Sequence, residues 1–187
     1  MKILKLGQMI GGSNSPKPSG LLNEYSINFD GANDNVDCGD SNDFSFGNGT
    51  TDSAFSISAW INASNLAIDR AIVSKNSSAA QEYTFKVLSN GALNFTLFDT
   101  LGPDADYATV QSASAGTITT GSWFHVVASY AGNGSTSGMA MFVNGSALST
   151  SASTNNYTAM SNGTAPFLIG KDEVIRKIWS GNIDEVS

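Results

Sequence analysis

Residues 55–61 read FSISAWI and carry a strand signal from which the fold class follows. Its apolar residues Phe55, Ile57, Ala59 and Ile61 stand at alternate positions. Because successive side chains of a β-strand point to opposite faces, this spacing predicts a strand with one buried face. We therefore expect these four side chains to face the core together.

Short alternating segments of the same kind recur along most of the chain. They predict further strands at residues 25–29, 82–88, 92–98, 123–130, 138–143, 167–170 and 182–186. The turns at residues 89–91 (SNG) and 144–145 (NG) suit tight hairpins, because Asn and Gly accept a positive φ. No segment keeps a helical period, so we expect an all-β sandwich or barrel with long polar loops at residues 100–121 and 149–165.

Residues 1–24 differ from the rest of the chain. The stretch at residues 11–20, GGSNSPKPSG, has the composition of a linker. We predict an N-terminal arm at residues 1–24 and one domain at residues 25–187. The arm contacts another chain by strand addition to a sheet edge, or it folds back on its own domain. Its candidate partner-binding residues are the apolar Ile3, Leu4, Leu6, Met9 and Ile10.

Composition and charge argue against several classes of function. The net charge is −7, and no basic stripe is present to neutralise nucleic-acid phosphates or to dock on anionic lipid. No apolar run approaches the roughly 20 residues of a membrane span. The single cysteine excludes an internal disulfide, and one cysteine with one histidine makes no zinc site. The N-terminus lacks the long apolar segment of a secretory signal.

A series of short motifs resembles the laminin-G-like jelly rolls of the concanavalin A-like lectin and glucanase superfamily. The resemblance covers residues 25–187 and implies two antiparallel sheets packed face to face, one of them curved, with the first and last core strands as neighbours. The motifs lie at residues 29–31 (FDG), 34–39 (DNVDCG), 55–61, 72–75 (IVSK), 121–127 (GSWFHVV), 142–145 (FVNG), 168–170 (LIG) and 181–186 (GNIDEV).

The resemblance also implies a structural Ca²⁺ that ties the first strand to the last. Mapped onto this chain, its ligands are Asp30, Asp34 and Asp184. Carboxylate oxygens of this kind suit Ca²⁺. The alternative is a solvated acidic turn without a metal.

The acidic residues do not predict an enzyme. Glucanases of this superfamily carry Glu-x-Asp-x-x-Glu on one strand, and this chain has no such pattern. Asp184 and Glu185 are adjacent, so they point to opposite faces of a strand. We therefore predict that the chain has no catalytic residues.

Several other residues have both a structural and a functional interpretation. We assign Cys38 and the three tryptophans, Trp60, Trp123 and Trp179, to the core, and we interpret His125 as structural. Tyr107 and Tyr157 fall in predicted loops, so they are the better candidates for stacking on sugars.

Two hypotheses follow for the function. The first is a virion structural protein, such as a phage capsid decoration, fibre or tail component. Such a protein would be a homo-oligomer, anchored to other virion chains through its arm and displaying a lectin-like jelly roll. The alternative is a carbohydrate-binding lectin module that is extracellular or at the cell surface. A host-surface glycan is a candidate ligand under either hypothesis.

Overall fold

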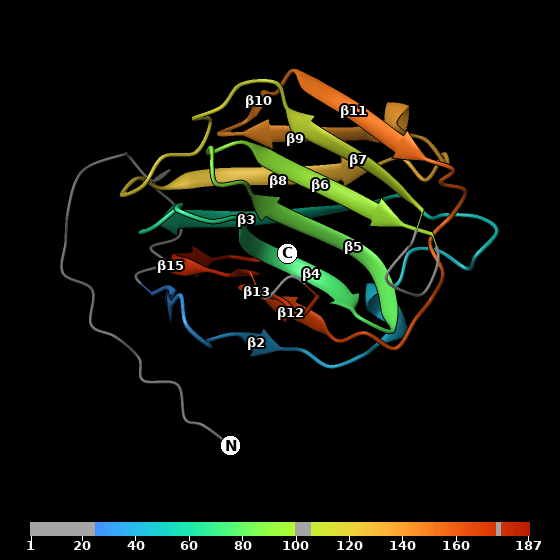
Figure 1. Ribbon diagram of the computed structural model, residues 1–187, viewed down its shortest axis with the longest axis horizontal. Helices are drawn as coiled ribbons and strands as arrows, with labels where there is room; N and C mark the ends of the chain where they lie inside the picture. Colours follow the sequence, from blue (N-terminus) through green and yellow to red (C-terminus); the bar gives the residue numbers. More distant parts are fainter. Residues whose placement is uncertain (1–24, 100–105, 175–176) are drawn as a thin grey trace.

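The computed structural model describes residues 25–99, 106–174 and 177–187 (Figure 1). The arm residues Ile3, Leu4, Leu6, Met9 and Ile10 therefore lie outside the described residues. The described chain is a sandwich of two large antiparallel sheets, as the sequence predicts. Figure 1 shows the strands of one sheet running obliquely to those of the other.

The first sheet has six strands and includes the stretch at residues 55–61. Its strands β1 and β15 are neighbours, with Ile27 opposite Ile183, which confirms that the first and last core strands pair. In spatial order the strands are β1 (Ile27–Asp30), β15 (Ser180–Asp184), β3 (Phe55–Ala63), β8 (Phe124–Tyr130), β9 (Met139–Val143) and β10 (Ser146–Ala147).

The second sheet has seven strands. In spatial order they are β11 (Thr150–Asn155), β7 (Tyr107–Ser112), β6 (Leu93–Phe98), β5 (Ala80–Val87), β4 (Arg70–Ser77), β12 (Phe167–Ile169) and β2 (Val36–Asp37). A small hairpin of β13 (Lys171–Asp172) and β14 (Lys177–Ile178) packs against β4. The helical turns η1 (Asn42–Phe44) and η2 (Thr136–Gly138) lie in loops.

The core lies between the two sheets. Ile57, Ala59 and Ile61 are buried and Phe55 packs against them, so the predicted common face of residues 55–61 is confirmed. From the other sheet, Phe85 on β5 and Phe95 on β6 are fully buried in the same core. Both predicted hairpin turns form as well, with positive φ at Gly91 and at Asn144 followed by Gly145.

The two predicted loops at residues 100–121 and 149–165 are partly wrong, because each contains a strand. Strand β7 buries Ala108, Val110 and Ser112 on its core side, and only the first two of these are apolar, so its hydrophobic alternation is short. Strand β11 reads TSASTN and has no large apolar residue. It is held by main-chain pairing to β7, from Thr150 opposite Ser112 to Asn155 opposite Tyr107, and main-chain pairing leaves no hydrophobic pattern in the sequence.

Candidate functional site

Hydroxyl side chains form a row across the outer face of the seven-stranded sheet. The register aligns five of them on five neighbouring strands, namely Ser74, Thr84, Thr96, Thr109 and Ser153. Neighbouring strands lie about 4.8 Å apart, so this hydroxyl row spans about 19 Å. The adjacent row on the same face contains Lys86, Asn94, Gln111 and Ser151.

Side-chain hydrogen bonds fix the central part of the hydroxyl row. Asn94 Nδ2 donates to Thr109 Oγ1 at 3.0 Å, and the hydroxyl oxygens of Thr96 and Thr109 are 2.8 Å apart. Thr96 Oγ1 also lies 3.1 Å from Asn94 Oδ1. These contacts hold the polar atoms in place, so a ligand would meet a preorganised surface.

The β13–β14 hairpin covers one end of this row. Ser74 Oγ donates to Lys171 O at 2.8 Å, and Asn76 Nδ2 lies 3.2 Å from each carboxylate oxygen of Asp172. Ser74 and Thr84 are consequently buried, whereas Ser153 at the other end is exposed. On β6, Thr96 and Asn94 are buried as well, so the accessible part of the row lies over β7 and β11.

An aromatic pair lies at the end of β6 and β7. Phe98 and Tyr107 are opposite each other in the register, and both are half-buried. Alternation along the strands points them away from the core, on the same side as Thr96 and Thr109. Tyr107 thus has the position that its predicted role in sugar stacking requires.

Tyr157 does not have such a position, and that prediction is wrong. Its ring belongs to the core cluster, and its hydroxyl donates to Asp52 Oδ2 at 2.6 Å. Asp52 Oδ2 also accepts from the Tyr130 hydroxyl at 2.7 Å, and its Oδ1 accepts from the Met160 N–H. Burial, together with hydrogen bonds to the Asp52 carboxylate, raises the pKa of Tyr130 to about 12 and raises the pKa of Tyr157 as well. Asp52 therefore links β8 to the segment around Tyr157, and burial of the Tyr157 ring in the core keeps it from stacking on a sugar.

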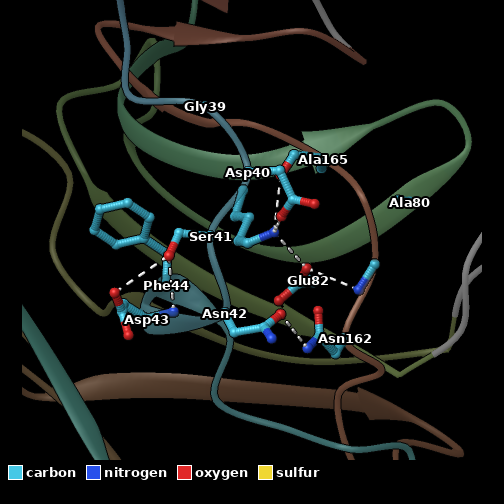
Figure 2. Close-up of polar contacts among 12 residues, drawn as sticks. Gly39, Asp40, Ser41, Asn42, Asp43, Phe44, Ala80, Glu82, Asn162 and Ala165 are labelled. Atoms are coloured by element: carbon cyan, nitrogen blue, oxygen red, sulfur yellow. Dashed lines mark hydrogen bonds and ion pairs between the residues drawn. The ribbon is translucent and has the colours of Figure 1, made fainter.

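A buried ion cluster lies between β4, β5 and two loops (Figure 2). Lys75 Nζ contacts Glu82 Oε1 at 2.8 Å and Asp40 Oδ1 at 2.9 Å, and it donates to Ala165 O at 2.8 Å. The side chains of Lys75 and Glu82 are fully buried. All three ammonium protons have acceptors, and no substrate can reach Glu82. The two carboxylates therefore serve as a structural anchor and not as an accessible acid–base pair.

The three predicted calcium ligands do not come together. Asp30 is opposite Ser180 at one end of β15, whereas Asp184 lies at the other end, about 13 Å away along the strand. Asp30 Oδ1 accepts from the Ala32 N–H, and Asp34 Oδ2 accepts from the Asp30 N–H, so both acids close a turn. Residues 25–99, 106–174 and 177–187 contain no group of three or more His, Cys, Asp or Glu side chains placed to hold a metal ion. The proposed ligand set is therefore wrong, while calcium binding itself stays a prediction.

The tryptophans divide between two environments. Trp179 is fully buried in the core, as predicted. Trp60 and Trp123 are only half-buried and are not among the side chains that pack against the core, so their assignment to the core is wrong. Trp60 is out of phase with Ile57, Ala59 and Ile61 on β3, so it points outward. Its ring lies 5.3 Å from that of His125.

Cys38 is exposed, which contradicts its predicted place in the core. It follows β2 at the edge of the seven-stranded sheet, where its N–H donates to Phe167 O at 3.0 Å. Partial burial and the nearby Asp37 carboxylate raise the pKa of its thiol. The thiol is therefore reachable but a weak acid, with less thiolate at neutral pH than an ordinary cysteine.

An open pocket of about 400 Å³ lies beside the β13–β14 hairpin. Lys171 and Glu173 line it and form an ion pair of 3.5 Å, which balances the charge of the Glu173 carboxylate. The other lining residues are Ala32, Asn33, Ser78 and Ile178.

Among the described residues, no helix has the length and hydropathy of a membrane span.

Comparisons with known proteins agree with this architecture. The family described as the concanavalin A-like lectin/glucanases superfamily matches residues 30–187. No curated protein sequence matches the chain.

Three solved structures illustrate the similarity, and at identities below 20% they show the fold alone. Domains LG4-5 of the mouse laminin alpha1 chain match with a TM-score of 0.57 and 11% identity, covering 84% of this chain and 40% of that one. A putative carbohydrate binding protein from Bacteroides ovatus matches with a TM-score of 0.55 and 17% identity, covering 86% and 42%. The CBM40 of Ruminococcus gnavus IT-sialidase matches with a TM-score of 0.53 and 10% identity, covering 72% and 74%.

Proposed function

Because the chain belongs to the concanavalin A-like lectin/glucanases superfamily, we propose that it is a non-catalytic module that binds glycans on the outer face of its seven-stranded sheet. The observation that carries this proposal is the ordered row of hydroxyl and amide groups that ends at Phe98 and Tyr107. Sugar hydroxyls both donate and accept hydrogen bonds, as do the accessible side chains of Thr109, Gln111 and Ser153 on this face. The aromatic pair offers apolar surface for the C–H face of a sugar ring.

The same face argues against hydrolysis. Glycosidases need two carboxyl groups about 5 to 9.5 Å apart on either side of the scissile bond. The side chains of the two polar rows and of the aromatic pair include no carboxylate, and Glu82 is engaged in the buried ion cluster. The arrangement therefore supports binding without turnover.

A complex of one of the similar structures also supports the proposal of glycan binding. The Ruminococcus gnavus module is also known bound to alpha2,3 sialyllactose, at 9% identity and a TM-score of 0.53 to this chain. A glycan-binding module of this fold is expected to work outside the cell or at its surface. We extend this location to the present chain as part of the proposal.

A glycan array with the full chain tests the proposal, followed by titration of the best ligand. Tyr107→Ala and Gln111→Ala should each weaken binding by about tenfold or more, equivalent to about 1.4 kcal/mol. Ser56→Ala, an exposed change on the other sheet, is the matched control and should bind like the wild type. Unchanged melting temperatures would show that the variants fold. Absence of any glycan ligand, or equal affinity in all four proteins, would refute the proposal.

The virion hypothesis stays a prediction. It depends on residues 1–24, which lie outside the described residues, and none of the similar structures above is a virion protein by its description. Deleting residues 1–20 should leave a folded jelly roll that no longer joins its assembly. Continued co-sedimentation of the truncated chain with particles would exclude the arm as the anchor.

A further inference from the structure

Strand β11 forms one edge of the seven-stranded sheet, at the top of Figure 1. It pairs with β7 on one side, and no strand among the described residues pairs with its other side. The side chains at its first five positions are all exposed, namely Thr150, Ser151, Ala152, Ser153 and Thr154. Since alternate side chains of a strand point to opposite faces, β11 is accessible on both faces.

The other edge strands of the two large sheets are short or carry a charge. Strands β2 and β10 have two residues each, and β1 has four residues and ends at Asp30. Natural proteins protect sheet edges in this way, or with proline and β-bulges. Strand β11 has six residues, contains no proline or charged residue, and pairs with β7 without a shift in register. It therefore presents the one long unprotected edge among the described strands of these sheets.

The register shows which main-chain groups of β11 point to the free edge. The Ala113 N–H donates to Ser149 O at 2.9 Å, in the same register as the ladder between β7 and β11. In an antiparallel ladder, hydrogen-bonded pairs alternate with pairs whose main-chain groups point away from each other. The N–H and C=O groups that point away from β7 are therefore those of Thr150, Ala152 and Thr154.

The sequence of this edge is complementary to itself. Residues 150–154 read TSAST, which is the same in both directions. If a second copy pairs antiparallel about Ala152, Thr150 lies opposite Thr154 of the second copy, and Ser151 lies opposite Ser153 of the second copy. The outward main-chain groups then meet at Ala152 and at both Thr pairs, where each pair exchanges two hydrogen bonds. Cross-strand pairs of Thr and Ser add to this pairing. Such self-complementarity is what a two-fold contact requires.

The distribution of charge also favours a second copy. A net charge of −7 opposes self-association in general, because the two copies repel each other. Residues 107–170, however, contain no Asp, Glu, Lys or Arg. This stretch includes β7, β11 and the helical turn η2 that lies beside β11. Two copies can therefore meet at β11 without bringing like charges together, and a charged partner would find no opposite charge there.

We infer that β11 is a dimerisation edge, at which the seven-stranded sheet continues into a second copy of this chain across a two-fold axis at Ala152. The axis is perpendicular to the sheet, so both copies turn the same outer face to the same side. The contact uses main-chain groups at the edge and leaves that face accessible, so it does not depend on the glycan site proposed above. Because the pairing occupies β11 of both copies, the assembly closes at a dimer.

Analytical ultracentrifugation of the full chain tests the inference. The wild type should show a reversible equilibrium between monomer and dimer. Ala152→Lys and Ala152→Glu would each place like charges directly opposite each other, so each alone should weaken the dimer by about tenfold or more. An equimolar mixture of the two variants should recover the dimer, because opposite charges then face each other across the axis. Ala32→Lys, an exposed change beside the opposite edges of the sheets, is the matched control and should dimerise like the wild type.

A disulfide provides a second, independent measurement. In a Cys38→Ser background, Ala152→Cys should form a covalent dimer on oxidation, because the Cα atoms of a hydrogen-bonded antiparallel pair lie about 5.5 Å apart, within the range of a disulfide. Ser153→Cys in the same background should not, because the axis places it opposite Ser151 of the second copy. Unchanged melting temperatures would show that the variants fold.

Three results would overturn the inference. The first is a wild type that stays monomeric up to about 1 mM. The second is a dimer that Ala152→Lys and Ala152→Glu both leave intact, since another surface would then hold it. The third is open-ended assembly in place of a dimer, because a two-fold contact at β11 closes. Glycan binding by the monomer would be unaffected in each case, so the proposed function is tested separately.

Discussion

Replacing Lys75 by methionine removes the only cation of the buried ion cluster while keeping a side chain of similar length. The Glu82 carboxylate would remain fully buried, with the Gly163 N–H as its one remaining hydrogen-bond donor among the described residues. Removing one partner of a buried ion pair costs about 3–5 kcal/mol, because the other charge is left uncompensated. For a chain of this length, the melting temperature should fall by roughly 10 °C.

Chemical unfolding followed by circular dichroism measures this effect in a double-mutant cycle of Lys75→Met and Glu82→Gln. The double variant should be less destabilised than the sum of the two single variants, by about 1–3 kcal/mol, because it no longer buries an unpaired Glu82 charge. Lys86→Met, a change at a half-buried lysine on the same sheet, is the matched control and should cost within about 0.5 kcal/mol. A loss below about 1 kcal/mol for Lys75→Met, or additive effects, would refute the reasoning.

Four further predictions concern the core, a glycine, pH and metal. Ile61→Ala should lower the free energy of unfolding by about 2–5 kcal/mol in the same assay, because Ile61 is fully buried. Gly181→Ala should lower the free energy of unfolding by at least roughly 2 kcal/mol, because Gly181 has a φ of +124° and the new Cβ would overlap the Asn62 carbonyl oxygen. Gly116→Ala, where space around the new Cβ is open, should lower it less. The pKa of Tyr130 is raised to about 12, against about 10 in the unfolded chain. The free energy of unfolding should therefore stay constant up to about pH 10 and fall between about pH 10 and 12, because the unfolded chain loses the Tyr130 proton first. Phenolate absorbance at 295 nm follows this ionisation. If the chain binds Ca²⁺, the melting temperature should be higher with Ca²⁺ than with EDTA through a ligand set other than Asp30 with Asp184, which cannot share an ion; equal melting temperatures would contradict calcium binding.

Most strands that bury large side chains could be predicted from the sequence. Strand β4 is buried on both faces and shows no alternation, so it could not, and neither could the polar edge. The alternation of residues 55–61 indicates both the strand and its buried face, because hydrophobic burial produces that pattern. Strand β11 pairs through its main chain and carries Ser and Thr side chains, which are equally common in loops. Its neighbour β7 gives a similarly weak signal, because Ala108 and Val110 are the only apolar side chains among the three on its core side.

The candidate sites depend on register, which the sequence does not contain. Asp30 and Asp184 lie on paired strands, but only the observed pairing shows that they stand at opposite ends of β15. The hydroxyl row likewise needs four strand pairings to bring Ser74 and Ser153 into line. For Trp60 a signal was present, because its position is out of phase with the buried residues of β3. The position of Trp60 in the family motif favours the core, whereas its phase on β3 correctly indicates an outward side chain.

The exposed thiol of Cys38 gives the chain a single natural tether. Cys38 stands beside β2, at the opposite edge of the seven-stranded sheet from β11. When the protein is attached to a solid support through this thiol, the accessible end of the hydroxyl row therefore faces away from the support. With one cysteine in the sequence, maleimide coupling gives one orientation for every molecule. The raised pKa of this thiol means that the coupling proceeds faster at mildly alkaline than at neutral pH. A protein immobilised in this way presents both outer sheet faces to soluble ligands in a uniform layer.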